Sequence, residues 1–514
     1  ECYARYKLLK EEKQAKATVG AREEKSVGAS STVEEDDDLD GLLREVGIDD
    51  PVAEPKQKPQ PERASEKVLP NDRVNAGPSP ASTRGIRLGR GVLREAPQNT
   101  QASGPHVPSA EKVVMRAEDK AESSQDAAGS SSAKELDSYA AATILKRDPL
   151  TVDEANSIRE LLFNDRKRGF NEAWSKQGFF FAEAKDLGFG LVQRAGGPCG
   201  VLAVVNAFVL EALVSRGTWH DPSSREQESA LVSALATLVF TAAQGSGRAC
   251  VCLPSTGSPH LYRSSLYSPD GVSERLVKFF LRADSSQSLE PFLLENLSAF
   301  TEPDGCGSLA LLFSCVLSRG VQAVRADMDE GFAGEVRTLL DRHAYMSQEG
   351  VNLLLSGRAV SNVFDGERVL SDQVQGSGDS VTLRGLSARG KVGFLTLQEA
   401  YNYLEVGSFL KCPETPVWVV YSESHYSVLF ATEPGAVVDP RSKGPSRGGK
   451  PLDLYYWDML AKQREVIRLS VVPDHDEELP DVNDETALTP PLDLVIRTKW
   501  RGCFVDWNGT EEIL

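Results

Sequence analysis

The chain has 514 residues, of which 40% are hydrophobic, and a formal net charge of −18 at pH 7. This length and composition allow at least one large hydrophobic core. The acidic charge argues against nucleic acid as the main partner, because phosphates attract basic surfaces. No apolar run reaches the length of a membrane span, so we expect no membrane-embedded part. The eight cysteines contain no CxxC pair, which indicates neither a disulfide framework nor a structural metal and fits a reducing, intracellular compartment.

Residues 1–138 are predicted to form a disordered, low-complexity tail. No Phe, Trp or Tyr occurs from Lys7 to Ser138, and such a segment buries too little apolar area to offset its chain entropy. Within it, the acidic stretch 34–50, EEDDDLDGLLREVGIDD, has apolar residues at helical intervals and could fold on an unknown partner. A solvated acidic spacer is the simpler interpretation.

Order is predicted to begin between Leu136 and Ala142 and to extend to the C-terminus. Apolar residues three and four apart predict helices at 152–166, 199–215, 228–243, 272–281, 307–319, 333–343 and 395–406. Apolar runs predict strands at 417–421, 426–430, 436–439 and 466–472. The polar stretch 365–393 predicts a surface insertion. Helices followed by antiparallel strands indicate an α+β fold and not a doubly wound sheet.

One cysteine lies in an unusual setting, in the sequence QRAGGPCGV at 193–201. Pro198 suits the first turn of a helix, and the flanking glycines permit close backbone approach. Cys199 should therefore begin a helix, where the helix dipole favours a thiolate. Taken alone, a small buried hydrophobe is the commoner role for such a cysteine. Gln193, six residues upstream, is placed as an amide that could bind an oxyanion.

A cysteine nucleophile needs a base, and the chain has six histidines. His425 stands between two β-runs in PVWVVYSESHYSVLF, where a histidine could face the helix of the cysteine. The other five lie in the tail, in turns, on a helix surface or in an acidic loop. His425 is therefore the predicted general base.

The third group, which would orient the imidazole, is harder to predict. Asp439, fourteen residues after His425, is the obvious carboxylate. If 426–431 and 436–441 form a hairpin, Asp439 faces Val428 and lies about 10 Å along the strand from His425. We therefore expect either a bulge that closes this gap or a site that works as a Cys–His dyad.

Several longer stretches resemble the MINDY deubiquitinases, particularly their branch with long insertions. The resemblance rests on segments that begin at 193, 350, 395, 453 and 490, namely QRAGGPCGVLAVVNAFVL, GVNLLLSGRAVSNVFDG, LTLQEAYNYLEVGSFLKCPETPVWVVYSESHYSVLF, DLYYWDMLAKQREVIRLSV and PPLDLVIRTKWRGCFVDWNG. It covers residues from about 140 to the end. It implies a papain-like catalytic domain over 139–514, with Cys199 as nucleophile, His425 as general base and Gln193 in the oxyanion hole.

The resemblance also implies a substrate and a location. The family cleaves isopeptide bonds in ubiquitin chains, prefers lysine-48 linkages and uses no metal or cofactor. The expected partners are ubiquitin and polyubiquitin, and the expected location is the cytoplasm, with the nucleus left open. Within SGRAVSNVF, Arg358 and Asn362 are expected to brace loops. Two alternatives stay open: a ubiquitin-chain-binding scaffold with weak or no catalysis, and a transglutaminase-like acyl transferase.

Overall fold

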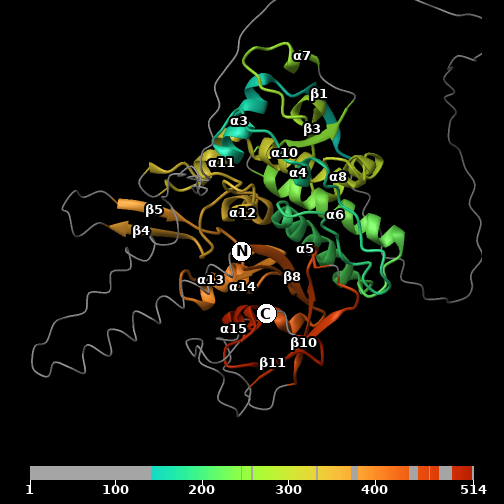
Figure 1. Cartoon of the computed structure of the whole chain (residues 1–514), viewed down its shortest axis with the longest axis vertical. Coiled ribbons are helices and arrows are strands. Elements are labelled where there is room, and N and C mark those ends of the chain that lie inside the picture. The colour runs from blue at the N-terminus through green and yellow to red at the C-terminus, as the bar shows by residue number, and fades with distance from the viewer. Residues whose placement is uncertain are drawn as a thin grey trace, which may run out of the picture. The chain divides into compact units, whose positions relative to one another are not determined.

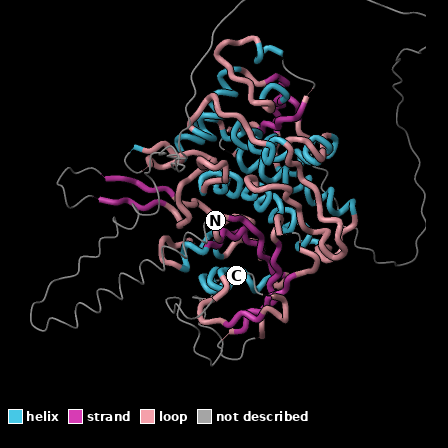
Figure 2. The backbone as a smooth tube through the Cα atoms, viewed as in Figure 1, coloured by secondary structure: helices cyan, strands magenta, loops and turns pink. Residues whose placement is uncertain are grey.

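The structure, a computed structural model, describes residues 141–244, 246–255, 259–331, 334–371, 380–438, 450–461, 463–473 and 489–511. The tail predicted for residues 1–138 and the acidic stretch 34–50 lie outside the described residues. The first element, β1, begins at Thr143. The described residues combine helices with mainly antiparallel sheets (Figures 1 and 2), so the α+β class is confirmed.

The largest sheet has six strands in the order β11-β10-β9-β8-β7-β6. All neighbouring pairs are antiparallel except β6 and β7, which run parallel. The strands are β6 (Gly393–Thr396), β7 (Val417–Ser422), β8 (His425–Ala431), β9 (Leu452–Trp457), β10 (Ile467–Val472) and β11 (Phe504–Asp506).

Two smaller sheets complete the described strands. An antiparallel sheet has the order β1-β3-β2, and a two-stranded ribbon pairs β4 with β5. Their bounds are β1 (Thr143–Pro149), β2 (Ala249–Pro254), β3 (Leu276–Arg282), β4 (Glu367–Ser371) and β5 (Ser380–Arg384). The ribbon lies within the predicted surface insertion 365–393 and extends away from the other described elements in Figures 1 and 2.

The longer helices have clear start signals. Thr151 and Ser223 each cap a helix through a reciprocal capping box with a glutamate three residues later. The α-helices of seven or more residues are α3 (Val152–Phe163), α5 (Cys199–Arg216), α6 (Ser224–Ala243), α8 (Ser286–Glu295), α10 (Gly307–Arg319), α11 (Val321–Asp327), α12 (Gln348–Ser356) and α15 (Pro491–Lys499). The shorter helices are α4 (Glu172–Ser175), α7 (Pro259–Tyr262), α9 (Ser298–Thr301), α13 (Leu397–Ala400), α14 (Ser408–Lys411) and the 3₁₀ turns η2 (Ser273–Arg275) and η4 (Pro434–Val437).

The six-stranded sheet separates two hydrophobic clusters. Val419 and Val428 point into the larger cluster, which contains most of α5, α6 and α10. Trp418 and Val420 point to the opposite face, into a smaller cluster that contains α15. This alternation follows from the two-residue period of a strand. The sheet is thus covered on both faces, with α5 packed against β7 and β8.

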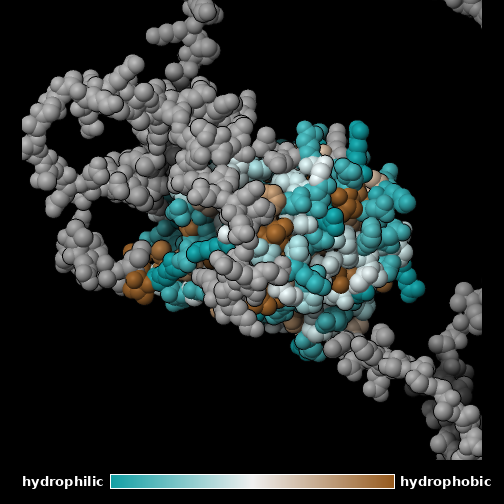
Figure 3. Space-filling view, turned by 90° about the horizontal axis from the view of Figure 1, so that it is seen from below, coloured by the Kyte–Doolittle hydropathy of each residue, from teal (hydrophilic) through white to brown (hydrophobic). Residues whose placement is uncertain are grey.

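Helix α5 is almost entirely apolar. Its length and composition would suit a membrane span, but most of the helix is buried inside the fold. It is the central core helix, and its first residue is Cys199. On the face shown in Figure 3, hydrophobic areas are small and scattered among hydrophilic ones, as is normal for a protein surface.

Four predicted elements are wrong. The helix expected at 272–281 is replaced by the short 3₁₀ turn η2 and by strand β3, because LVKFFLR at 276–282 pairs with strands on both sides. No α-helix covers the described part of 333–343, where Leu340 instead bridges to Met346. The expected helix 395–406 begins as strand β6 and then makes the single turn α13. The described part of the strand expected at 436–439 does not form, because 434–437 make the 3₁₀ turn η4.

Candidate active site

Cys199 occupies the first position of α5, which confirms the prediction for QRAGGPCGV. Pro198 is the N-cap residue, and Gly197 adopts φ 133°, a conformation that side chains rarely tolerate. A Cβ atom on Gly197 would also approach Nε1 of Trp174 to 3.2 Å. Cys199 itself is buried, and its Sγ lies 4.0 Å from the carbonyl oxygen of Gly197. The glycine turn therefore fixes the thiol at the N-terminus of a buried helix.

His425 is the first residue of β8, the strand on which α5 packs. Its Nε2 lies 2.9 Å from Oδ1 of Asp458, and Cys199 is close enough to influence the pKa of its imidazole. Burial by itself would lower the pKa of His425, but the hydrogen bond to Asp458 and the interaction with Cys199 outweigh burial and raise that pKa to about 10. The imidazole therefore lies on the strand that packs against the helix of Cys199 and is fixed by a carboxylate, and its protonated form is favoured.

Asp458 is the orienting carboxylate that the sequence reasoning missed. Burial would raise its pKa, but the hydrogen bond to His425 and the neighbouring positive charge lower it below the usual value. Its Oδ1 also accepts hydrogen bonds from the backbone N–H groups of Leu460 and Ala461. The carboxylate is thus held charged at the end of β9, directly beside His425.

The expected hairpin between 426–431 and 436–441 is wrong, for a reason of strand pairing. β8 pairs with β9, with Val428 opposite Trp457, and residues 434–437 form a turn. Asp439 lies outside the described residues. Asp458 stands in the segment DLYYWDML, where the alternating apolar residues of 452–457 followed by an aspartate could have indicated a strand that ends at the site.

Gln193 lies on the segment that leads into Cys199 and is buried. Its backbone N–H donates to the carbonyl oxygen of Met459 at 3.0 Å, and its side-chain Nε2 donates to the carbonyl oxygen of Ala195 at 2.7 Å. The side-chain Oε1 is buried without a hydrogen-bond partner. Because a primary amide carries two N–H groups, Gln193 retains one donor for another acceptor.

The remaining histidines are placed away from this arrangement or lie outside the described side chains. His220 stacks on the neighbouring Trp219, with ring centroids 5.2 Å apart. His343 is exposed and lies 3.1 Å from Nε of Arg342. The seven described cysteines are all free, and in the described part of the chain no group of three or more His, Cys, Asp or Glu side chains could hold a metal ion.

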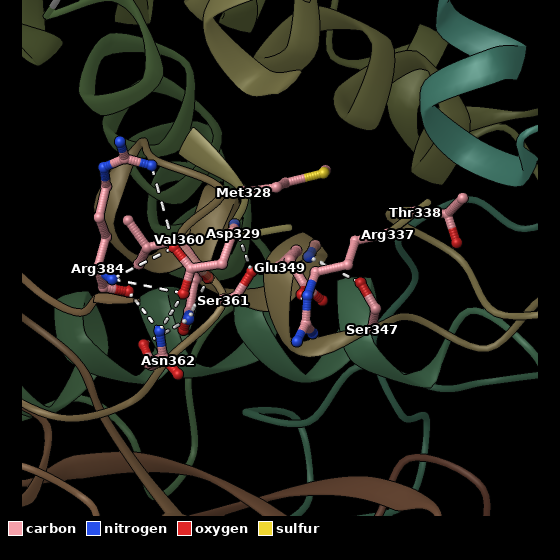
Figure 4. A network of polar contacts seen from close by, with 12 residues as sticks. Met328, Asp329, Arg337, Thr338, Ser347, Glu349, Val360, Ser361, Asn362 and Arg384 are labelled. Atoms are coloured by element: carbon pink, nitrogen blue, oxygen red, sulfur yellow. Dashed lines mark hydrogen bonds and ion pairs between the residues drawn. The ribbon is translucent and has the colours of Figure 1, made fainter. Parts of the chain in front are cut away.

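The bracing role expected for Arg358 and Asn362 is confirmed. Nδ2 of Asn362 donates to Oδ2 of Asp329 at 2.6 Å and to the carbonyl oxygen of Arg384 at 2.9 Å (Figure 4). Arg358 forms an ion pair with Asp327 at 3.4 Å. These contacts join the end of α11, the segment after α12 and the base of the β4–β5 ribbon.

A cysteine at the start of a buried helix, served by an imidazole that a carboxylate orients, is the arrangement that defines thiol hydrolases. Residues 159–509 match the family described as deubiquitinating enzyme MINDY-3/4, conserved domain. The chain therefore belongs to the MINDY-3/4 family of deubiquitinating enzymes, as the sequence motifs predicted.

Individual relatives agree with this assignment. The chain is 41% identical over 374 residues to the probable ubiquitin carboxyl-terminal hydrolase MINDY-4 of Mus musculus, a match that covers 71% of this chain and 47% of the relative. For the MINDY-4 of Homo sapiens the identity is 40% over 374 residues, with 71% and 46% covered. The ubiquitin carboxyl-terminal hydrolase MINDY-3 of Mus musculus is 32% identical over 280 residues, with 50% and 60% covered.

The chain spans about half the length of the MINDY-4 relatives that it matches. No solved structure matches it.

Proposed function

We propose that the protein is a deubiquitinase that hydrolyses isopeptide bonds in polyubiquitin chains, with a preference for lysine-48 linkages, on a papain-like core. The observation that carries the proposal is the pairing of Asp458 with His425, which begins the strand that packs against α5, the helix that begins at Cys199. The printed names of the relatives, ubiquitin carboxyl-terminal hydrolases, support ubiquitin as the substrate.

The reaction begins with the Cys199 thiolate and the His425 imidazolium. Because Nε2 of His425 faces Asp458, Nδ1 is the ring nitrogen that serves the thiol. The thiolate attacks the carbonyl carbon of ubiquitin's terminal glycine, a C–S bond forms, and the carbonyl electrons move onto oxygen. When the tetrahedral intermediate collapses, the C–N bond breaks and His425 gives its proton to the departing lysine amine.

Water completes the cycle. His425 removes a proton from water, and the resulting hydroxide attacks the thioester. The C–S bond then breaks, the new carboxylic acid releases its proton to solvent, ubiquitin leaves with a free carboxylate, and the Cys199 thiolate is restored beside the imidazolium. Asp458 stabilises the imidazolium in both steps and keeps Nδ1 directed at the thiol.

Gln193 is assigned to the oxyanion hole. Its spare amide N–H and the backbone N–H of Cys199 would together donate to the oxyanion of the tetrahedral intermediate. The position of Gln193 on the segment that enters α5, and its contact with Met459 beside Asp458, support this assignment.

Ubiquitin with a C-terminal electrophile tests the chemistry. The full chain should form a covalent adduct, whereas Cys199→Ala should form none and still fold and bind ubiquitin chains, since alanine fits the start of a buried helix. An unchanged adduct in Cys199→Ala would remove Cys199 from the mechanism. Chain binding by the unaltered protein without an adduct would instead favour a ubiquitin-binding scaffold.

A panel of ubiquitin chains of each linkage tests the substrate. Lysine-48 chains should be cleaved fastest, and hydrolysis should leave free ubiquitin with no new cross-links. Transfer of ubiquitin to added amines in preference to water would identify a transglutaminase-like acyl transferase. The cytoplasm, with the nucleus left open, is the proposed location, and imaging of the tagged chain in cells tests it.

A further inference from the structure

The loop between β9 and β10 connects two parts of the candidate active site. Asp458, which orients His425, begins this loop. One residue later, the carbonyl oxygen of Met459 accepts the backbone N–H of Gln193 at 3.0 Å. Just before the loop, Nε1 of Trp457 donates to the carbonyl oxygen of Leu191 at 2.9 Å. The loop therefore carries the carboxylate that orients His425 and also contacts the segment that carries Gln193.

The side chain of Gln463 connects the end of this loop to its beginning. Oε1 of Gln463 accepts the backbone N–H of Asp458 at 2.6 Å, and Nε2 of Gln463 donates to the carbonyl oxygen of Tyr456 at 3.2 Å. Both groups of the amide are thus used on the two sides of Trp457. Gln463 is only partly buried, so its two bonds fix the loop without filling the core.

We propose that Gln463 is a positioning residue for catalysis, which holds Asp458 against His425 and, through Met459, holds Gln193 in place beside Cys199. The inference rests on the proposed cysteine-hydrolase chemistry. Its physical basis is that loss of the Gln463 amide frees the backbone of Asp458, and an error of about 1 Å in a catalytic group can cost about 100-fold in rate.

Two substitutions separate positioning from simple packing. Gln463→Leu keeps the approximate size but removes both hydrogen bonds, whereas Gln463→Glu keeps an oxygen that can accept the N–H of Asp458. We expect Gln463→Leu to lower kcat on a fluorogenic ubiquitin substrate by about 10- to 100-fold with little change in KM. Gln463→Glu should recover most of this loss.

The pH profile gives a readout that a merely structural role would not move. Asp458 and Cys199 are the groups that act on His425 and raise its pKa. If Asp458 moves away, that pKa falls, so the alkaline limb of kcat/KM should shift to lower pH in Gln463→Leu. Gln227→Leu is the matched control, because Gln227 is a partly buried glutamine that donates to the backbone of Gly188 at 2.7 Å. It should leave the limb unchanged.

A titration of the histidines by NMR in the full chain separates this inference from the proposed function. The His425 resonance, assigned by its loss in His425→Gln, should titrate at lower pH in Gln463→Leu even if ubiquitin proves not to be the substrate. An unshifted His425 resonance together with unchanged kcat would overturn the positioning role. If Gln463→Leu fails to fold, Gln463→Ala takes its place, because it also lacks both hydrogen bonds and the position is only partly buried. An unchanged kcat together with an unshifted His425 resonance in Gln463→Ala would overturn the positioning role.

Discussion

His425 and Asp458 form a hydrogen-bonded pair at 2.9 Å that sets the charge of the imidazole. The pKa of His425 rises from an ordinary value of 6.5 to about 10, so the imidazolium should persist through neutral pH and be lost only as the pH approaches about 10. Cys199 therefore has a cationic imidazolium as its neighbour over the whole physiological pH range. The His425–Asp458 pair should therefore set the alkaline limb of the pH–activity profile.

Asp458→Ala should lower kcat/KM by about 100-fold or more, because the imidazole loses its orientation and its charge stabilisation. The pKa of His425 should fall from about 10 towards its ordinary value. The alkaline limb of the pH–rate profile should move down accordingly. Asp439→Ala is the control and should keep near-normal activity. A larger loss of activity in Asp439→Ala than in Asp458→Ala would show that Asp439, and not Asp458, orients His425.

Gln193→Ala tests the oxyanion donor. Loss of one such donor costs about 10²- to 10³-fold in turnover, and we expect kcat to fall by that amount with KM little changed. The free energy of unfolding should be measured in parallel, because Gln193 also donates to the carbonyl oxygen of Ala195. Near-normal turnover at unchanged stability would leave Gln193 with a structural role only.

At the scale of elements, the β4–β5 ribbon is the part of the described fold that is least tied to the rest. Val369 and Val381 are 64% and 59% exposed, and the two described strands pair only with each other. By contrast, its base is held firmly, since Asn362 binds both Asp329 and the backbone of Arg384 (Figure 4). The base and not the ribbon should therefore matter for stability.

Replacing residues 369–382 with the two-residue turn Asn-Gly should leave kcat unchanged and the free energy of unfolding within about 1 kcal/mol. Arg368 and Leu383, which face each other in the ribbon, would then flank the turn. Asn362→Ala should instead lower the free energy of unfolding by about 1–3 kcal/mol, because it leaves the buried Asp329 short of a donor. Denaturant unfolding measures both, and a ribbon deletion as costly as Asn362→Ala would contradict this ranking.

At the scale of the whole molecule, the chain divides by composition near residue 138. Residues 1–140 carry a net charge of −5 and the rest −13 of the total −18. The family match covers residues 159–509 and so lies entirely after this division. The chemistry should therefore reside entirely in the second part, while the first could add affinity through a tethered contact.

A truncated protein that begins near Lys134 should unfold cooperatively and cleave ubiquitin chains within a few-fold of the rate of the full chain. Any difference should appear in apparent affinity, because a tethered contact raises local concentration without altering the site. Steady-state kinetics of both proteins on the same chains measure this. A truncated protein that folds and binds chains but has lost turnover would show that the first part belongs to the catalytic machinery.

The sequence by itself determined the local features. Adjacent residues determine where a helix starts, so GGPCG predicted Cys199 at the first position of α5. The capped or apolar helices at 152–163, 224–243 and 307–319 were predicted to within a few residues for the same reason. The place of His425 on a strand that faces the helix of Cys199 was also predicted, because the chain has few histidines and only one stands between two apolar strands. Such signals need no knowledge of distant contacts.

Tertiary structure decided whatever depends on pairing between distant segments. The run LVKFFLR has apolar spacing that suits either a helix or a strand, and only β1 and β2 on its two sides make it a strand. Asp458 joined the site because β8 pairs with β9, more than twenty residues onward, and not with the nearer segment at 436–441. Strand partners are selected by burial of both faces of a sheet, a property that no single segment contains.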